Sequence, residues 1–271
     1  MVDQKYLEKA EVLIEALPYI RRFHDKIIVV KYGGSAMIDE ELKREVIQDV
    51  VLLKLVGFRP IIVHGGGKAI TEAMEFVNLP VEFKDGQRVT TPEAMDLVRT
   101  VLMGKVNQEL VEALNEHGNF AVGVSGADAG VIVAEQASPD LGRVGRITRI
   151  NRPLLDDLVN ADYIPVVASV ALGEDGGFYN VNADMVAGHI AAAIGAHKVV
   201  FLTDVDGLYE NFEDKSTLIS NLTLFEAQYL IENDVVSTGM IPKLKSCVTA
   251  LDAGVFRAHI LNGTTPHSLL L

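Results

Sequence analysis

The stretch IIVVKYGGS, residues 27–35, decides the fold class of this 271-residue chain. Its continuous apolar run predicts a strand that is buried on both faces, and the glycine pair after it predicts a tight turn. Further apolar runs lie at 60–64, 163–169, 198–203 and 256–262, with helical patterns between them. This alternation predicts an α/β fold with a mostly parallel sheet that is covered by helices on both faces.

The helices and the remaining strands are predicted from the periodicity of the apolar residues. Helices are expected from Asp39 to about Gly57, after the GGGK of 65–68, over 92–117, within 151–162, from residue 185, and over 223–233 and 241–253. Short strands are expected at 120–124 and 131–135, and residues 143–150 are expected to form part of an antiparallel excursion.

The first 25 residues stand outside this pattern. Residues 4–17 form an amphipathic helical pattern with Leu7, Ala10, Ile14 and Leu17 on one face. Pro18 is predicted to kink or end the helix, because proline lacks an N–H and clashes with the preceding turn. We expect residues 1–25 to form a helical extension that packs on the chain's own core or meets another subunit.

Composition and charge exclude several classes of protein. The chain carries 37 acidic against 24 basic residues, a net charge of −13, and has no basic tract, so a nucleic-acid partner is disfavoured. Cys247 is the only cysteine, which excludes an intrachain disulfide and a cysteine-based metal cluster. The N-terminus lacks the order of a signal peptide, and no apolar stretch reaches the roughly 18 residues of a membrane span. We expect a soluble cytoplasmic protein without a membrane partner.

Polar and glycine residues gather where three predicted strands end. These segments are Lys31–Gly34, His64–Lys68 and Thr203–Gly207. In an open parallel sheet, ligands bind beyond the carboxyl ends of the strands, and glycine lets backbone N–H groups approach a phosphate or carboxylate. The pattern favours an anion site, although two tight turns without a ligand remain the alternative.

The glycine clusters match neither common nucleotide fingerprint. A P-loop is excluded because Ala69 follows Lys68, and the dinucleotide pattern is excluded because Ile70 stands where its last glycine belongs. Asp204-Val205-Asp206-Gly207 resembles the start of a calcium loop, but its glycine comes too early. The histidines show no metal-ligand spacing.

Two lysines occupy unusual positions. Lys31 lies in a strand expected to be buried, so it either extends to solvent from an edge strand or is a fixed cation facing a phosphate. Lys243 follows Pro242 in the first turn of a predicted helix, where a cation opposes the helix dipole unless an anion binds nearby. A solvated lysine is the alternative there.

Asp184 and Arg88 also allow two interpretations each. Asn182 is expected to cap a helix, and Asp184 suits the first turn of that helix; alternatively, Asp184 holds the two lysines in position. Arg88 follows a predicted turn, where it is either solvated or binds a carboxylate through its planar guanidinium.

The segments VVKYGG, IIVHGGGK, GQRVT, YNVNAD, FLTDVDGLY and GMIPK, in this order, resemble the amino acid kinase family. The resemblance runs from about residue 26 to 263. Within the family, it is strongest to the members that act on N-acetyl-L-glutamate. It implies a three-layer α/β/α sandwich in a single domain, 26–271. Residues 26–178 would form an N-terminal lobe that binds the acyl amino acid, and 179–271 a C-terminal lobe that binds ATP.

The resemblance also implies an activity and its residues. The side-chain carboxylate of N-acetyl-L-glutamate would be phosphorylated by ATP, an early step of arginine biosynthesis. Lys31 and Lys243 would stabilise the transferring phosphoryl group, and Asp184 would orient them. The substrate would contact Gly66, Gly67, Arg88 and Asn180, and the nucleotide would contact Gly33, Gly34, Thr203, Asp204, Gly207, Tyr209, Gly239, Met240 and Ile241. Mg²⁺ would be held mainly by the phosphates, with no metal site on the protein. No general base is needed, because a carboxylate is already a nucleophile at neutral pH.

Assembly and regulation follow from the resemblance only as expectations. In arginine-inhibited hexameric members a kinked N-terminal helix joins subunits, so a homo-oligomer (dimer or hexamer) is expected here. Those members carry a C-terminal tail that helps bind arginine, and this sequence stops at Leu271; arginine is therefore a possible effector only. The alternatives are another carboxylate or carbamate kinase of the same fold, or a catalytically silent nucleotide-binding regulatory module.

Overall fold

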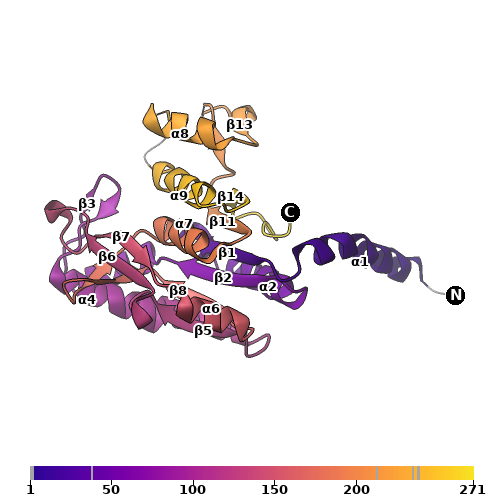
Figure 1. Ribbon diagram of the computed structural model, residues 1–271, viewed down its shortest axis with the longest axis horizontal. Helices are drawn as coiled ribbons and strands as arrows, with labels where there is room; N and C mark the ends of the chain where they lie inside the picture. Colours follow the sequence, from indigo (N-terminus) through magenta and orange to yellow (C-terminus); the bar gives the residue numbers. More distant parts are fainter. Residues whose placement is uncertain (1–2, 38, 212, 234, 237–238) are drawn as a thin grey trace.

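A six-stranded parallel sheet forms the centre of the molecule (Figure 1). The computed structural model describes residues 3–37, 39–211, 213–233, 235–236 and 239–271. In spatial order the strands are β14 (Arg257–Asn262), β11 (Lys198–Thr203), β1 (Ile27–Tyr32), β2 (Arg59–His64), β8 (Ile164–Ala168) and β5 (Ala121–Ser125). The predicted sandwich with a mostly parallel sheet is confirmed.

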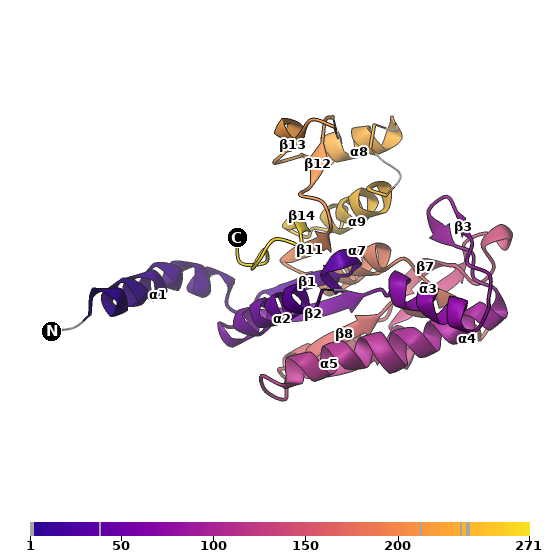
Figure 2. The same ribbon diagram turned by 180° about the vertical axis from the view of Figure 1, so that it is seen from behind.

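Helices cover both faces of this sheet (Figures 1 and 2). One face packs on α2 (Glu40–Leu55), α3 (Gly67–Phe76), α4 (Pro92–Val101) and α5 (Gln108–Asn115), and the other on α6 (Pro153–Asn160), α7 (Ala183–Ile194) and α9 (Ile241–Asp252). Successive strand residues point to opposite faces, so Val30 joins the first core and Val29 the second. A smaller cluster lies under α8 (Leu224–Glu232) and the β12 (Leu208–Tyr209) and β13 (Leu218–Ile219) hairpin.

A second, four-stranded sheet lies beside the first. Its order is β10 (Phe178–Asn180), β9 (Val170–Gly173), β6 (Ile132–Gln136) and β7 (Gly145–Ile150). The β6–β7 pair is antiparallel, which confirms the predicted excursion. The sequence did not predict β9 and β10, nor the two-residue strands β3 (Phe83–Lys84) and β4 (Gln87–Arg88), which are too short to show a period. Short 3₁₀ turns lie at Gly34–Met37, Asp128–Gly130, Pro139–Leu141 and Lys215–Thr217.

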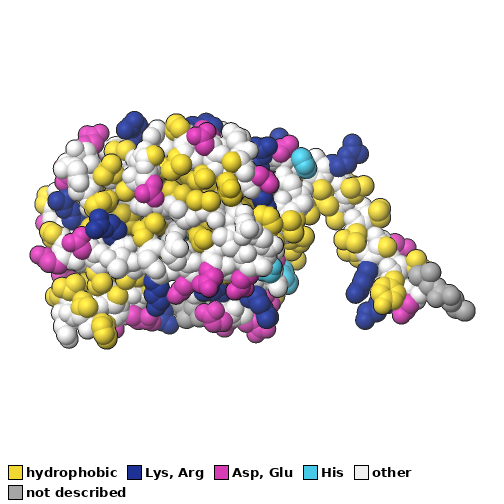
Figure 3. All heavy atoms as spheres, turned by 90° about the horizontal axis from the view of Figure 1, so that it is seen from below, with side chains coloured by type: hydrophobic (Ala, Val, Ile, Leu, Met, Phe, Trp, Pro, Cys, Tyr) yellow, Lys and Arg dark blue, Asp and Glu magenta, His cyan; other side chains and the backbone are white. Residues whose placement is uncertain are grey.

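The N-terminal helix α1 spans Gln4–Phe23 and projects from the body (Figure 3). The helix does not end at Pro18, so the predicted boundary was wrong. Pro18 leaves the Ile14 carbonyl without its helical donor, but Ile14 is exposed, so a water molecule can donate to that carbonyl instead. No residue of α1 is buried. At its end the Phe23 ring stacks on the Phe58 ring, with the two ring centres 5.5 Å apart. The chain's own core therefore does not cover this helix, and contact with another subunit stays a prediction.

The helix predicted over 92–117 differs from the structure in its middle. A π-helical segment, Leu102–Asn107, separates α4 from α5. A π turn takes up one residue more than an α turn, and such turns occur often at functional sites. The segment brings Asn107 into the buried core.

No helix among the described residues is long and apolar enough to cross a membrane.

Candidate active site

Three strand ends meet at the carboxyl edge of the main sheet. Strand β1 lies between β11 and β2, and Lys31 is in register with Phe201 on one side and Val63 on the other. The interpretation of Lys31 as an edge-strand residue is therefore wrong, because β1 is central. Its ammonium group instead lies at the sheet edge where ligands of parallel sheets bind.

Lys31 and Lys243 converge on one carboxylate. The Lys31 Nζ lies 3.1 Å from Oδ1 of Asp184, and the Lys243 Nζ lies 3.2 Å from Oδ2 of the same group. The three side chains are 11%, 17% and 7% exposed for Lys31, Lys243 and Asp184. Residues from β1, α7 and α9 thus form one partly buried cluster with two positive charges and one negative charge.

Local helix structure explains how Asp184 and Lys243 reach this cluster. Asn182 caps α7 as predicted, since its side chain accepts hydrogen bonds from the N–H groups of Asp184 and Met185. Pro242 lies in the first turn of α9, which places Lys243 there too. Both helices begin at the cluster, so their N-terminal dipoles add to its positive potential.

The charge state of Asp184 follows from its surroundings. Burial on its own raises the pKa of Asp184, but the Lys31 and Lys243 ammonium groups outweigh it, so the net pKa lies below that of an ordinary aspartate. The carboxylate is ionised at neutral pH, and the cluster keeps a net charge of +1. In a chain of net charge −13 this is a local anion-binding potential.

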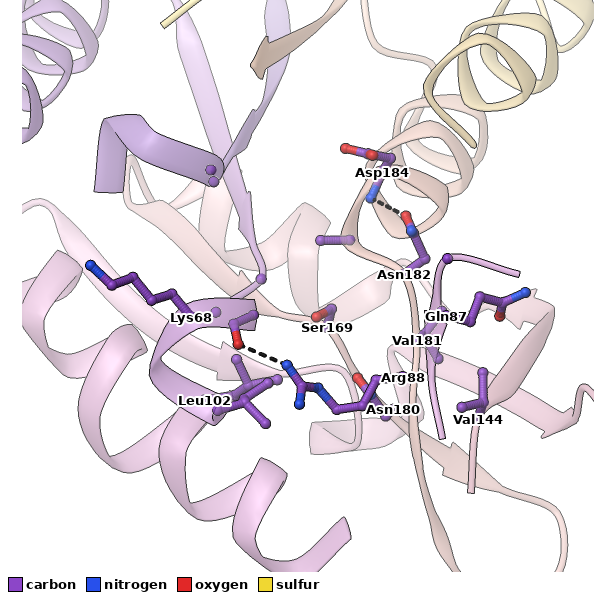
Figure 4. Close-up of a pocket in the computed structure, with 18 of the residues that line it drawn as sticks. Lys68, Gln87, Arg88, Leu102, Val144, Ser169, Asn180, Val181, Asn182 and Asp184 are labelled. Carbon is purple, nitrogen blue, oxygen red and sulfur yellow. Dashed lines mark hydrogen bonds between the residues drawn. The ribbon is translucent and has the colours of Figure 1, made fainter. Parts of the chain in front are cut away.

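A first cavity of about 350 Å³ opens beside Lys31 and Asp184 (Figure 4). Its wall includes the predicted residues Gly33, Gly34, Gly66, Gly67, Arg88 and Asn180. A Cβ at Gly33 would lie 2.9 Å from the Lys31 Nζ, so glycine leaves room for the ammonium group. Gly67 is the first residue of α3, and in the described structure its N–H and that of Gly66 donate no hydrogen bond. These two N–H groups suit an oxygen anion.

Arg88 is a buried cation at the far end of this cavity. Its Nη2 donates to the Gly67 carbonyl at 2.9 Å and to the Thr71 Oγ1 at 2.7 Å, and the guanidinium lies 4.7 Å from the centre of the Phe83 ring. Burial lowers its pKa, and none of the ion pairs between described residues includes it. The solvated-turn interpretation was wrong, because Arg88 lies in β4 and faces inward. Such a group fits a ligand carboxylate.

Asn180 joins the same wall from β10. Its Nδ2 lies 3.3 Å from the Thr90 Oγ1, and that hydroxyl donates to the Arg88 carbonyl at 3.0 Å. Figure 4 shows Asn180 close to Arg88, while Lys68, which also lines the cavity, points away from both. The structure therefore brings together all four of the residues predicted to contact the acceptor.

A second cavity of about 350 Å³ lies on the other side of the Asp184 cluster. It contains Lys243 and the predicted residues Thr203, Asp204, Gly207, Tyr209, Gly239 and Met240. Ile241 begins α9 next to Met240 but does not line it, and Gly33 and Gly34 line the first cavity instead. Asp184 connects the two cavities, because it contacts one lysine from each.

Sequence reasoning missed the support beneath the glycine loop. The Nδ1 of His64 donates a hydrogen bond to the Gly65 carbonyl at 2.9 Å, and its Nε2 lies 2.9 Å from the Nδ2 of Asn107. Both side chains are fully buried. Nothing in the local sequence distinguishes Asn107 from an exposed helical asparagine, because its burial depends on the π segment.

Comparison with known proteins identifies the family of this chain. Residues 26–262 match the profile of the Amino acid kinase family. The chain belongs to the amino acid kinase family. Its curated relatives include the acetylglutamate kinase of Caldanaerobacter subterraneus subsp. tengcongensis, 49% identical over 97% of this chain and 89% of the relative. The acetylglutamate kinase of Petrotoga mobilis is 48% identical, over 98% and 89% of the two chains.

Solved structures extend the match of this amino acid kinase to three dimensions. The smu.665 protein of Streptococcus mutans UA159 is 31% identical with a TM-score of 0.76, over 87% of this chain and 94% of that one. N-acetylglutamate synthase from Neisseria gonorrhoeae has a TM-score of 0.81 at 24% identity, over 95% of this chain and 59% of that one, and shares the fold.

The buried His64 should make the free energy of unfolding of this amino acid kinase depend on pH. Burial lowers the pKa of His64 from 6.5 to about 4. Below pH 6.5 the unfolded chain binds a proton at this histidine and the folded chain does not, so stability falls as the pH falls from 6.5 to 4. The contribution amounts to roughly 3 kcal/mol. Urea unfolding at several pH values should show that the free energy of unfolding falls more steeply with decreasing pH in the wild type than in His64→Gln. Parallel plots of this free energy against pH for the two proteins would contradict the prediction.

Proposed function

We propose that this amino acid kinase transfers the γ-phosphoryl group of ATP to the side-chain carboxylate of N-acetyl-L-glutamate. The products would be ADP and an acyl phosphate. The reaction would be an early step of arginine biosynthesis. The observation that carries the proposal is the pair of lysines held by Asp184 between two neighbouring cavities. The names of relatives that are 48–49% identical over nearly the whole chain support the choice of acceptor.

The first cavity suits the acceptor. N-acetyl-L-glutamate carries two carboxylates, and the wall offers an ionic partner at each end: Arg88 for the α-carboxylate, and the Lys31 side for the reacting one. The free N–H groups of Gly66 and Gly67 would receive oxygens of the reacting or transferring group. Asn180, beside Arg88, would contact the same acceptor.

The second cavity suits the nucleotide. Its wall combines the apolar groups of Val205, Leu208 and Met240 with the polar Thr203 and Asp204. With the base and ribose there, the phosphates would extend toward Lys243 and the Asp184 cluster. Mg²⁺ would be held mainly by the phosphates, since it usually binds through substrate phosphates and keeps several waters; it would neutralise part of their charge. The carboxylate of Asp204 in the wall is compatible with that cation.

The transfer requires two anions to approach each other. An oxygen of the acceptor carboxylate forms a bond to the γ-phosphorus, and the bond from this phosphorus to the β,γ-bridging oxygen breaks as ADP leaves. Lys31 would neutralise charge from the acceptor side and Lys243 from the nucleotide side, while Asp184 keeps both ammonium groups in place. A carboxylate needs no deprotonation, so no general base is involved.

The proposed acceptor can be tested directly. With ATP and hydroxylamine, the purified protein should yield a hydroxamate from N-acetyl-L-glutamate and little from N-acetyl-aspartate, whose carboxylates are one methylene closer, because the cavity pairs Arg88 with Lys31 at one separation. Release of ADP with carbamate, measured in the same buffer, should stay at background. Faster turnover with carbamate or another acid would assign a different kinase reaction, and absence of any turnover would favour a silent nucleotide-binding module.

The two lysines should matter for rate more than for nucleotide binding. Lys31→Ala and Lys243→Ala are each expected to lower kcat by about 10²–10³-fold, since each removes a charge that acts on the transferring group. KM for ATP should change much less. The matched control is Lys245→Ala, exposed on the same helix as Lys243. Near wild-type turnover in folded Lys31 or Lys243 variants would refute their roles.

Arg88 should determine acceptor binding. Arg88→Ala is expected to raise KM for N-acetyl-L-glutamate roughly tenfold to a hundredfold, because a charged hydrogen bond contributes about 1.5–3 kcal/mol. KM for ATP should stay within about twofold of the wild type, and Arg44→Ala, which removes an exposed arginine paired with Glu41, should change neither constant. A larger rise in KM for ATP than for the acceptor would be inconsistent with the assignment.

A further inference from the structure

The π-helical segment Leu102–Asn107 is fitted against the glycine loop of the first cavity. A Cβ at Gly66 would lie 2.7 Å from the Leu102 Cδ2 and 3.2 Å from the Val106 Cγ2. Leu102 also lines the cavity itself (Figure 4). The segment therefore forms the floor on which the loop 65–67 rests.

Asn107 extends this contact with hydrogen bonds of defined direction. Its Nδ2 lies 2.8 Å from the Val166 carbonyl and 2.9 Å from the Nε2 of His64. A carbonyl can only accept, so this end of the amide is the NH₂ group, and its second hydrogen points to His64. The Nε2 of His64 is thus an acceptor. The other amide atom, Oδ1, has no hydrogen-bond partner in the described structure and faces Gly123, where a Cβ would lie 2.1 Å away.

The proton of His64 then has one place left. Burial keeps the ring neutral at pH 7, since its pKa is lowered to about 4. A neutral imidazole carries one N–H, and with Nε2 accepting it must be at Nδ1. This N–H donates to the Gly65 carbonyl at 2.9 Å. The Asn107 amide at Nε2 and the Gly65 carbonyl at Nδ1 therefore select the same tautomer of His64.

The direction of the Gly65 carbonyl determines what the loop presents to the cavity. In a trans peptide the C=O and the following N–H point in opposite directions. No cis peptide bond occurs between described residues. With the Gly65 carbonyl turned to His64, the Gly66 N–H points to the opposite side of the loop. That N–H has no partner in the described structure, and Gly66 lines the cavity.

We propose that Asn107 and His64 are positioning residues for the transfer reaction: Asn107 fixes the Nδ1–H tautomer of His64, and His64 fixes the peptide between Gly65 and Gly66 so that its N–H meets the acceptor. The inference rests on the proposed function for the identity of that acceptor. Neither side chain reaches the cavity wall. Both act through the backbone of the loop.

This role also accounts for the π turn. Successive residues of an α-helix are about 100° apart around its axis, so removing the additional residue of the π turn would rotate Asn107 away from His64 by about that angle. An extended α-helix over 92–117 would then leave His64 without the donor that selects its tautomer. The π segment is the element that couples this helix to the loop.

The kinetic test compares two asparagines that lie eight positions apart. Asn107→Leu removes the donor to His64 but keeps four side-chain heavy atoms branched at Cγ, and it should raise KM for N-acetyl-L-glutamate and lower kcat so that kcat/KM falls tenfold or more, as expected for a misplaced catalytic contact. KM for ATP should stay within about twofold. Asn115→Leu is the control: Asn115 also hydrogen-bonds backbone, at Ala121, but lies away from the loop. It should lower stability without changing the acceptor kinetics.

A pair of variants at His64 separates positioning from packing. Asn has an amide nitrogen the same number of bonds from the backbone as Nδ1, so His64→Asn can still donate to Gly65 and should keep most acceptor kcat/KM. The amide nitrogen of Gln corresponds to Nε2 instead, so His64→Gln should lose as much as Asn107→Leu. Equal losses in both His64 variants, with equal thermal stability, would overturn the positioning role.

The tautomer itself can be observed without any turnover. In the wild-type protein, ¹⁵N chemical shifts of the His64 ring should show a protonated Nδ1 and a bare Nε2 at pH 7; a protonated Nε2 would overturn the inference. Wild-type kinetics in a folded Asn107→Leu would overturn it as well while leaving the proposed function intact. If the wild type lacked turnover with N-acetyl-L-glutamate, the proposed function would fail, and the ring shifts would still decide the tautomer.

Discussion

The carboxylate of Asp184, held between two ammonium groups, is the interaction on which the site depends. A buried carboxylate is costly in free energy unless cations compensate it, and two lysines in close proximity repel each other unless an anion lies between them. Each charge therefore requires the others. The arrangement also leaves one positive charge in excess, and that excess is what an incoming phosphate or carboxylate can use.

The fold brings the three residues of this cluster together. Lys31, Asp184 and Lys243 come from segments more than 50 residues apart in the chain, and only the central position of β1 and the common starting edge of α7 and α9 bring them together. Asp184 lines the first cavity and contacts Lys243 of the second, so in the proposed reaction each substrate would approach the cluster from its own side. Charge compensation and substrate separation thus have the same structural origin.

Much of this could be predicted from the sequence, because the signals were local. Apolar runs predicted five of the six main strands, and the sixth was predicted as a short strand at 120–124. Asn182 and Pro242 marked the starts of two helices as the structure has them. The family resemblance then brought the distant lysines into one hypothesis. The features that local sequence signals left undecided or missed depend on tertiary structure. Arg88 reads as a turn residue until β4 turns it inward, and Asn107 reads as a surface residue until the π segment rotates it into the core.

The central claim, that both ammonium groups act on one transferring group, is tested most directly by a crystal structure. Crystals grown with N-acetyl-L-glutamate, MgADP and a planar phosphoryl mimic such as aluminium fluoride would show the site as it is during transfer. The account predicts that the Nζ atoms of Lys31 and Lys243 both lie within hydrogen-bonding distance of the mimic or its bridging oxygens, with Asp184 still contacting both. A mimic bound away from either lysine, in a closed complex that contains both substrates, would contradict it.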